Sequence, residues 1–429
     1  MFVIFGKLFI GIASLAATVL AVRSERLNSL PFRSFARLAW AASLFTRLAV
    51  FVSFYLVLGL AVPSDVPAAY YPEAKAALAG KLVYRDFFST YGPLFPYLCA
   101  IPVRLWDSTK SIVLFAILLE SLAVPLWVRV FASEFSDRVV RIALICYALN
   151  PLLISTVAIA GQNHIWISPF LAAAVYWLQR RRDLWAGASL GLCLVATKFL
   201  ALIFLPVLYL LSRQKTRFLG GFAALAGAVC AAFWLKGADI LLPLKFQRSA
   251  GQESSGNLPY ILSLFGVPIT SSLYVISALI ILAGVCLLLW VYRRRLPDQM
   301  LISSVPVLIF VVVLLFSKKA FTTYWACGFF PLCVFWSHRF GAKIWPLIGF
   351  LFWGVTAMVE PTLYFRWVYS NNLETIAGLP AYKSAVFLVC QAVLLGFNVI
   401  VLRYCLSDVG KAIVGRESDC KPMLERVAT

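Results

Sequence analysis

Residues 38–62 read LAWAASLFTRLAVFVSFYLVLGLAV, residues 64–73 read SDVPAAYYPE, and residues 80–97 read GKLVYRDFFSTYGPLFPY. The first stretch is apolar apart from Arg47 and is long enough to cross a bilayer, which takes about 20 residues. The loop after it gathers three acids, an arginine and many tyrosines. Polar chemistry in this charge-poor chain is therefore expected at this loop, beside the head groups of the membrane.

The composition predicts an integral membrane protein. Of 429 residues, 62% are hydrophobic and 13% are charged, and the mean hydropathy is +0.89. Apolar runs recur from end to end and predict one all-α polytopic bundle of about 11–13 transmembrane helices. We expect a single domain over residues 1–429, made of an N-terminal helix with a basic cytoplasmic linker (1–37), a helical core (38–402) and a cytoplasmic tail (403–429).

The charge pattern indicates topology more than nucleic-acid binding. The net charge of +20 comes from short basic clusters between apolar runs and forms no stripe. The positive-inside rule then places the acidic loop on the outer face. Several lysines and arginines also fall in outer loops, which favours an anionic ligand there.

Two other residue types limit the chemistry. With only two histidines, the chain excludes a histidine-rich metal site and HExxH zinc chemistry. Most of the ten cysteines lie in or beside apolar runs without CxxC spacing, as expected of small core residues.

Three segments are predicted to depart from simple spans. Residues 1–22 form either a membrane helix or a re-entrant segment. Residues 91–106 are broken by prolines and predict a short helix lying in the interface. Residues 184–211 begin and end at basic clusters, so we expect two short helices with a turn near Lys198, at or just under the outer face.

An ordered set of motifs resembles a known family. Asp65, Tyr70, Ala74, Gly80, Tyr84-Arg85-Asp86-Phe87 and Tyr91-Gly92-Pro93-Leu94 are similar to the first outer loop of GT-C polytopic glycosyltransferases, especially family 87 and the protein mannosyltransferase-like group. Later landmarks of that group resemble Gly161-Gln162-Asn163, Ala186-Gly187 to Lys198 with Leu205-Pro206, and residues 318–324 before Pro331. The resemblance covers about Leu38 to Pro331. Gly92 departs from it, because the group often has a second proline there.

The resemblance implies an inverting transfer of a hexose, such as mannose, or a pentose from a polyprenyl-phosphate donor to a lipid, glycan or protein acceptor. Such a transfer needs a base for the acceptor hydroxyl and cations for the phosphate, but no general acid, because phosphate leaves as a stable anion. The enzyme would lie in the cytoplasmic membrane of a bacterium, or in the endoplasmic reticulum of a eukaryote, with its site on the outer or lumenal face.

Each candidate residue also has a structural alternative. Carried over from the resemblance, Asp65 is the base, although an aspartate before Pro67 also suits a helix cap. Phosphate binding is assigned to Arg85, Lys198, Arg248, Lys318 and Lys319. Sugar or acceptor binding is assigned to Tyr70, Glu73, Tyr84, Tyr91, Gln162, Asn163 and His164.

The alternatives are an Arg85–Asp86 ion pair, a solvated face for Glu73, snorkelling of Lys198 and a plain polar turn at residues 162–164. The sequence identifies no definite cofactor, and Asp65 with Asp86 is a weak candidate site for Mg²⁺ or Mn²⁺. Arg47 and Glu120 are expected to pair between helices.

Two other function classes remain open at this stage. A secondary transporter or lipid flippase would need ionisable groups near the bilayer midplane and often internal repeats. In this chain the acids gather at one membrane face. A non-catalytic assembly subunit would have no use for the set of residues around Asp65.

Overall fold

The computed structural model describes residues 2–243, 245, 256–265, 267, 271–317, 321–368, 370 and 378–425. These residues form helices joined by turns and irregular links, with one isolated bridge between Val83 and Phe87. The predicted all-α class is confirmed. The longer α-helices are α1 (Phe2–Arg23), α3 (Phe32–Phe51), α4 (Tyr71–Leu78), α5 (Phe95–Leu105), α6 (Thr109–Ala132), α7 (Asp137–Leu149), α9 (Ile167–Gln179), α10 (Asp183–Ala196), α12 (Lys215–Trp234), α15 (Ser271–Val291), α17 (Ser304–Phe316), α18 (Phe329–Phe340), α19 (Ile344–Leu363) and α20 (Ala381–Glu425).

Several of these helices are long and apolar enough to cross a membrane. Within the described part of the chain there are seven, or eight when the bent pair Asp137–Leu149 and Pro151–Ile159 is counted as one span. The N-terminal residues belong to this group as Ile4–Arg23. The prediction of about 11–13 crossings also counted segments that form helices of only 12 to 14 residues, such as α9, α10 and α18.

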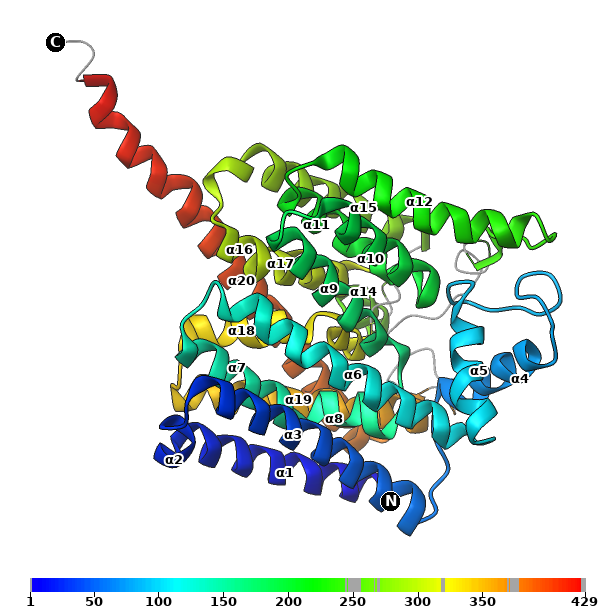
Figure 1. Ribbon diagram of the computed structural model, residues 1–429. Coiled ribbons are helices and arrows are strands. Elements are labelled where there is room, and N and C mark those ends of the chain that lie inside the picture. Colours follow the sequence, from blue (N-terminus) through cyan, green and yellow to red (C-terminus); the bar gives the residue numbers. More distant parts are fainter. Residues whose placement is uncertain are drawn as a thin grey trace. The chain divides into compact units, whose positions relative to one another are not determined.

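The chain divides into two compact units, residues 1–251 with 323–359, and residues 252–322 with 360–429. In the first unit α6 packs against α3 and α9, α7 packs against α3 and α18, and α10 lies along α12 (Figure 1). The prediction of one polytopic domain stays a prediction.

A buried ion pair ties three helices of the first unit together. The Arg47 guanidinium on α3 donates to both carboxylate oxygens of Glu120 on α6, at 3.1 and 3.0 Å. It also donates to the carbonyls of Ala148 and Tyr147 at the end of α7. The predicted interhelix pair is confirmed, and its extra hydrogen bonds offset the cost of burying two charges.

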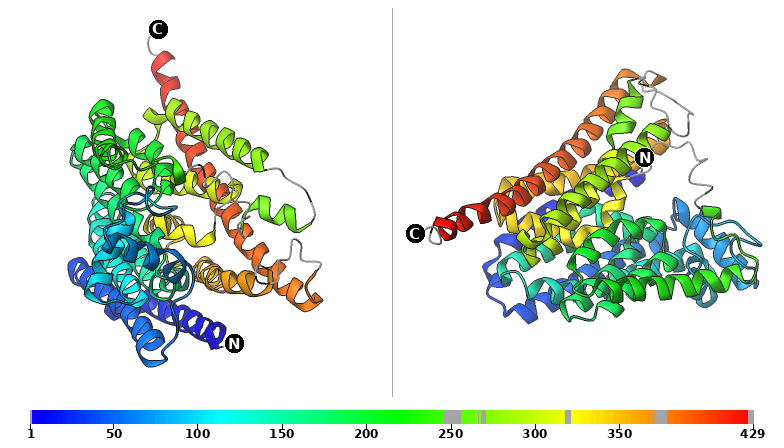
Figure 2. Two further views of the ribbon diagram at one scale, coloured as in Figure 1. Left: turned by 90° about the vertical axis from the view of Figure 1, so that its right-hand side faces the viewer. Right: turned by 90° about the horizontal axis from the view of Figure 1, so that it is seen from above.

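In the second unit α17 packs against both α15 and α20. Figure 2 shows α20 as one continuous helix, so the predicted tail at residue 403 begins within it. Inside this unit, the buried Gln391 amide donates to Glu360 at 2.7 Å, and its oxygen accepts from the Gly256 amide at 2.8 Å.

Candidate functional site

Asp65 begins a short helical segment after the first long span. The segment η2 (Val66–Tyr70) leads directly into α4, and Asp65 occupies its N-cap position. The Asp65 side chain nevertheless makes no capping hydrogen bond and is partly exposed. The predicted alternative of a helix cap is met in position, but the side chain of Asp65 does not make the capping bond. Ser64 just before it has a positive φ of 67°, a conformation that is rare outside glycine and concentrates at functional sites.

The loop around Asp65 is bonded to the predicted polar link at residues 161–164. The Gln162 amide donates to Ser64 Oγ at 3.0 Å, and the Asn163 backbone amide donates to the Tyr70 hydroxyl at 3.3 Å. Tyr70 in turn donates to Gln162 Oε1 at 3.5 Å. Gln162, Asn163 and His164 are all buried, which is not the arrangement of a plain exposed turn.

A second connection joins the loop to the break after α10. The chain leaves α10 at Ala196 and resumes in a helical segment at Phe199–Phe204, as the prediction of a turn near Lys198 requires. The Gly92 amide donates to the Thr197 carbonyl at 2.9 Å. A Cβ on residue 92 would lie 2.4 Å from the Val195 carbonyl oxygen. Glycine is therefore needed here to let the two backbones meet.

This connection places Lys198 beside the Asp65 loop. The Lys198 Nζ lies 5.7 Å from the ring centroid of Tyr91 and 4.9 Å from that of Tyr324. Such cation–π contacts stabilise an ammonium that has lost water. The carboxylate of Asp65 is also near enough to favour the charged form of Lys198, against the cost of its burial. Tyr324 packs edge-on against the His164 ring at 4.3 Å.

Glu73 is buried within the same group. Its side chain is 8% exposed, and its Oε2 accepts a 2.8 Å hydrogen bond from Ser89 Oγ, which itself accepts from the Tyr91 amide. Burial raises the pKa of Glu73 to about 8; the Ser89 hydrogen bond lowers it, and the charge of Asp65 raises it further. The predicted alternative of a solvated face is wrong.

We call the residues connected in this way the Asp65 cluster. They come from the first loop, the 162–164 link, the break after α10 and the segment before α18. The members are Asp65, Tyr70, Glu73, Tyr91, Gln162, Asn163, His164, Lys198 and Tyr324.

The remaining residues of the first loop have contacts of their own. Tyr84 is buried and donates its hydroxyl to the Tyr91 carbonyl, so it supports the cluster. Arg85 pairs with Asp86 at 2.8 Å and donates to the Lys236 carbonyl at 3.1 Å. The hydrogen bond from Arg85 and another from the Leu82 amide lower the pKa of Asp86 to about 2. The predicted Arg85–Asp86 ion pair is present, while a phosphate role for Arg85 stays a prediction.

Three predicted phosphate ligands, Arg248, Lys318 and Lys319, lie outside the described residues. Within the described ones, no group of three histidine, cysteine or acidic side chains could hold a metal ion. Asp86 is engaged by Arg85 and the Leu82 amide. The predicted site for Mg²⁺ or Mn²⁺ stays a prediction.

Sequence reasoning missed four contributors to the cluster: Ser64, Ser89, Thr197 and Tyr324. Ser64 and Ser89 act through their hydroxyls, and Thr197 acts through its backbone carbonyl. The only sequence signal for these three residues was their position next to or near Asp65, Tyr91 and Lys198. Among the buried side-chain groups that have no hydrogen-bond partner in the described part of the chain, Asn163 Nδ2 and Trp166 Nε1 belong to the short helix Asn163–Trp166. Unsatisfied buried donors are rare and suit a site that hydrogen-bonds a polar ligand.

A family model matches part of the chain that begins after Asp65 and Glu73. The family model described as Glycosyltransferase family 87 matches residues 88–317, more than half of the chain. The matched region contains Tyr91, the 162–164 link and Lys198. No curated protein matches the chain.

Proposed function

Because the chain belongs to glycosyltransferase family 87, we propose that it transfers a hexose or pentose from a polyprenyl-phosphate donor to a lipid, glycan or protein acceptor. The chain is a multi-pass membrane glycosyltransferase. The proposal adds the donor, an inverting mechanism, a site on the outer face of the membrane, and Asp65 as the catalytic base.

The observation that carries the proposal is the pairing of a carboxylate that makes no capping bond with a partly buried ammonium. Asp65 makes no capping bond, and Lys198 lies over the rings of Tyr91 and Tyr324 within electrostatic reach of it. Sugar transfer from a phosphate donor needs both charges: a base where the acceptor attacks and a cation where the phosphate leaves.

The step follows from those two charges. The acceptor hydroxyl oxygen attacks the anomeric carbon of the donor while its proton passes to the Asp65 carboxylate. The bond from the anomeric carbon to the phosphate oxygen breaks on the opposite face, and its electron pair leaves with the phosphate. Lys198 stabilises that negative charge, and attack opposite the leaving group inverts the anomeric centre.

Other members of the cluster are suited to hold the sugar and acceptor. Tyr70, Tyr91 and Phe95 pack edge-on or tilted at 4.6 to 5.1 Å between ring centroids and line one side of the cluster with aromatic surface. Asn163 Nδ2 is a donor with no protein partner among the described residues. We propose that these aromatic rings and Asn163 Nδ2 bind the sugar or the hydroxyl groups of the acceptor.

The test is transfer by the purified protein in lipid, with a panel of radiolabelled polyprenyl-phosphate sugars and total membrane glycolipid as acceptor. Asp65→Asn keeps the shape of the side chain but cannot accept the proton, so transfer should fall by about 100-fold or more while donor binding persists. Lys198→Met should weaken donor binding and slow transfer together.

The matched control is Asp107→Asn, which removes an exposed acid whose partner is Lys75 on α4. This variant should transfer sugar at the wild-type rate. An unchanged rate in Asp65→Asn would refute the assignment of the base. Flux of lipid or solute across the same vesicles, without transfer from any donor, would favour a transporter or flippase.

A further inference from the structure

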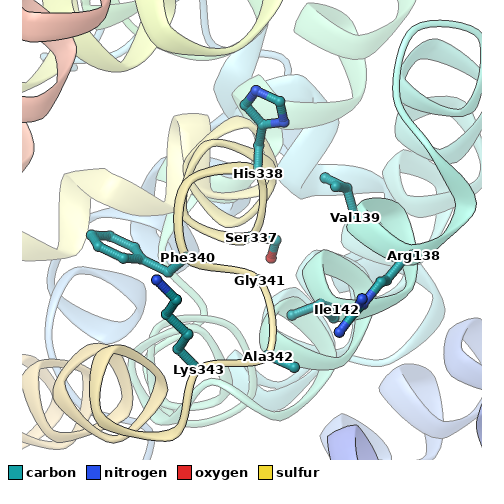
Figure 3. Close-up of a pocket in the computed structure, with 9 residues that line it drawn as sticks. All are labelled: Arg138, Val139, Ile142, Ser337, His338, Phe340, Gly341, Ala342 and Lys343. Atoms are coloured by element: carbon teal, nitrogen blue, oxygen red, sulfur yellow. The ribbon is translucent and has the colours of Figure 1, made fainter.

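A pocket lies in the first unit, between the start of α7 and the turn that joins α18 to α19. It has a volume of about 460 Å³. Figure 3 shows Arg138, Val139 and Ile142 on the α7 side and Ser337, His338 and the turn at Gly341 on the other. This volume falls in the range of small-ligand sites.

The lining combines positive charge with apolar walls. Its three ionisable members, Arg138, His338 and Lys343, are all basic and exposed, and no acidic residue lines the pocket. The nearest acid along the chain is Asp137, which precedes Arg138 in the first turn of α7. The His338 ring is packed edge-on against Phe135 at 5.3 Å. The pocket therefore suits an anion that carries an apolar portion.

Ser337 supplies a hydrogen-bonding group inside the pocket. It is 1% exposed, and its hydroxyl has no partner among the described residues. A serine within a helix usually donates back to a carbonyl three or four residues earlier, and this one does not. A buried hydroxyl without a partner costs free energy unless a ligand accepts its hydrogen bond.

The turn after α18 keeps the pocket open. Gly341 has φ 59° and ψ −138°, which a side chain would disfavour, and its amide caps α18 by donating to the Ser337 carbonyl at 2.8 Å. A Cβ at this position would meet no atom within 4 Å, so the space beside it is open.

This pocket lies at the membrane face opposite the Asp65 cluster. α6 starts beside the outer end of the first span, where Lys110 donates to the Tyr55 carbonyl, and it packs against the segment Val66–Tyr70 that follows Asp65. It ends at Ala132, five residues before α7 begins. Its 24 residues span about 36 Å, which exceeds the roughly 30 Å of a bilayer's hydrocarbon core. The basic residues around the pocket mark this as the cytoplasmic face by the positive-inside rule.

We propose that this pocket binds the phosphate of an anionic phospholipid head group from the adjoining leaflet. Arg138 and Lys343 provide charge, Ser337 donates a hydrogen bond to a phosphate oxygen, and the apolar walls contact the glycerol and upper acyl carbons. The site is separate from the proposed transfer site, and the proposal holds whichever donor the enzyme uses.

The test follows thermal unfolding of the full chain in dodecyl maltoside micelles that contain increasing phosphatidylglycerol, with phosphatidylcholine as the neutral comparison. We expect a saturable rise of the melting temperature with phosphatidylglycerol alone. In Arg138→Gln/Lys343→Gln the lipid concentration at half-saturation should rise about 30-fold, because each lost contact between a basic side chain and the bound phosphate costs about 1 kcal/mol.

The matched control is Arg33→Gln/Arg37→Gln, which removes the same charge from two exposed positions at the start of α3. Neither arginine lines the pocket, so this variant should leave the half-saturation point within about twofold of the wild type. If both double variants lost lipid affinity equally, or if the melting temperature rose with phosphatidylglycerol without saturating, the lipid would be held by diffuse surface attraction. Either result would overturn the proposed binding in the pocket.

Ser337→Ala gives an independent test that does not depend on charge. Removing an unpaired buried hydroxyl should leave the lipid-free melting temperature unchanged or slightly higher, while lipid affinity falls about tenfold. A wild-type lipid response in this variant would contradict the proposal. Equal stabilisation by millimolar inorganic phosphate would identify a free anion as the occupant and would overturn the assignment to a lipid.

Discussion

The buried carboxyl group of Glu73 makes the stability of the folded protein depend on pH. Its pKa is about 8 in the folded chain, where burial is the main cause, against an ordinary value of 4.5. Between these values the folded protein keeps the proton while the unfolded chain releases it, so the free energy of unfolding falls as pH rises. Because Glu73 lies on the short helix α4, which is not one of the candidate membrane spans, the unfolded reference is a carboxyl group in water.

The size of the effect follows from the same two values. The wild type should lose about 4 kcal/mol of unfolding free energy between pH 5 and pH 9 through this group. Glu73→Gln stays neutral, keeps an acceptor for Ser89 Oγ and should not show this loss. Its stability should therefore exceed that of the wild type increasingly as pH rises towards 9.

The assay is denaturant or thermal unfolding in detergent at several pH values from 5 to 9. Asp107→Asn is the control, because Asp107 is exposed and its hydrogen bonds from Lys75 and Tyr71 lower its pKa. That carboxylate is ionised throughout the range, so its curve should run parallel to the wild type. Parallel curves for Glu73→Gln and the wild type would refute a protonated Glu73.

Three further substitutions test other parts of the structure. Arg47→Met leaves Glu120 charged and buried without its partner, so it should lower the free energy of unfolding by about 3–5 kcal/mol. Adding Glu120→Leu should restore most of that stability, as measured by denaturant unfolding. Gly92→Ala would force the first loop away from Lys198. The rate of sugar transfer should fall at least tenfold, with little change in the far-ultraviolet circular dichroism spectrum. Full activity in this variant would argue against the backbone contact between Gly92 and Thr197. Arg85→Gln removes an exposed ion pair and a hydrogen bond to the Lys236 carbonyl, so the melting temperature should hardly change. A rise in the KM of the donor without a change in melting temperature would support the predicted phosphate role of Arg85.

Periodicity and charge predicted the parts of this fold that depend on local sequence. The apolar run before Asp65 forms a span, the basic ends of residues 184–211 predicted the break at Lys198, and Arg47 and Glu120 pair as expected. These outcomes follow because a charged side chain within an apolar helix needs either an oppositely charged partner or a position at the membrane interface.

The site was less predictable, because its contacts join segments far apart in the sequence. Nothing local to Glu73 indicates burial, since its neighbours Lys75 and Pro72 read as an exposed helical start. Its environment comes from Ser89, sixteen residues later. The number of crossings was also harder to predict, because helices such as α18 are shorter than a bilayer is thick.

The backbone contacts at Gly92 and the side-chain contacts of Gln162 together explain why so few charges suffice at the site. Gly92 fixes the loop to Thr197, beside Lys198, and Gln162 fixes it to Ser64, beside Asp65. The proposed base and the proposed phosphate-binding cation are thus held by separate anchors. A substitution at one anchor should therefore move only one of the two charges, and loss of the base and loss of phosphate binding should be separable in kinetics.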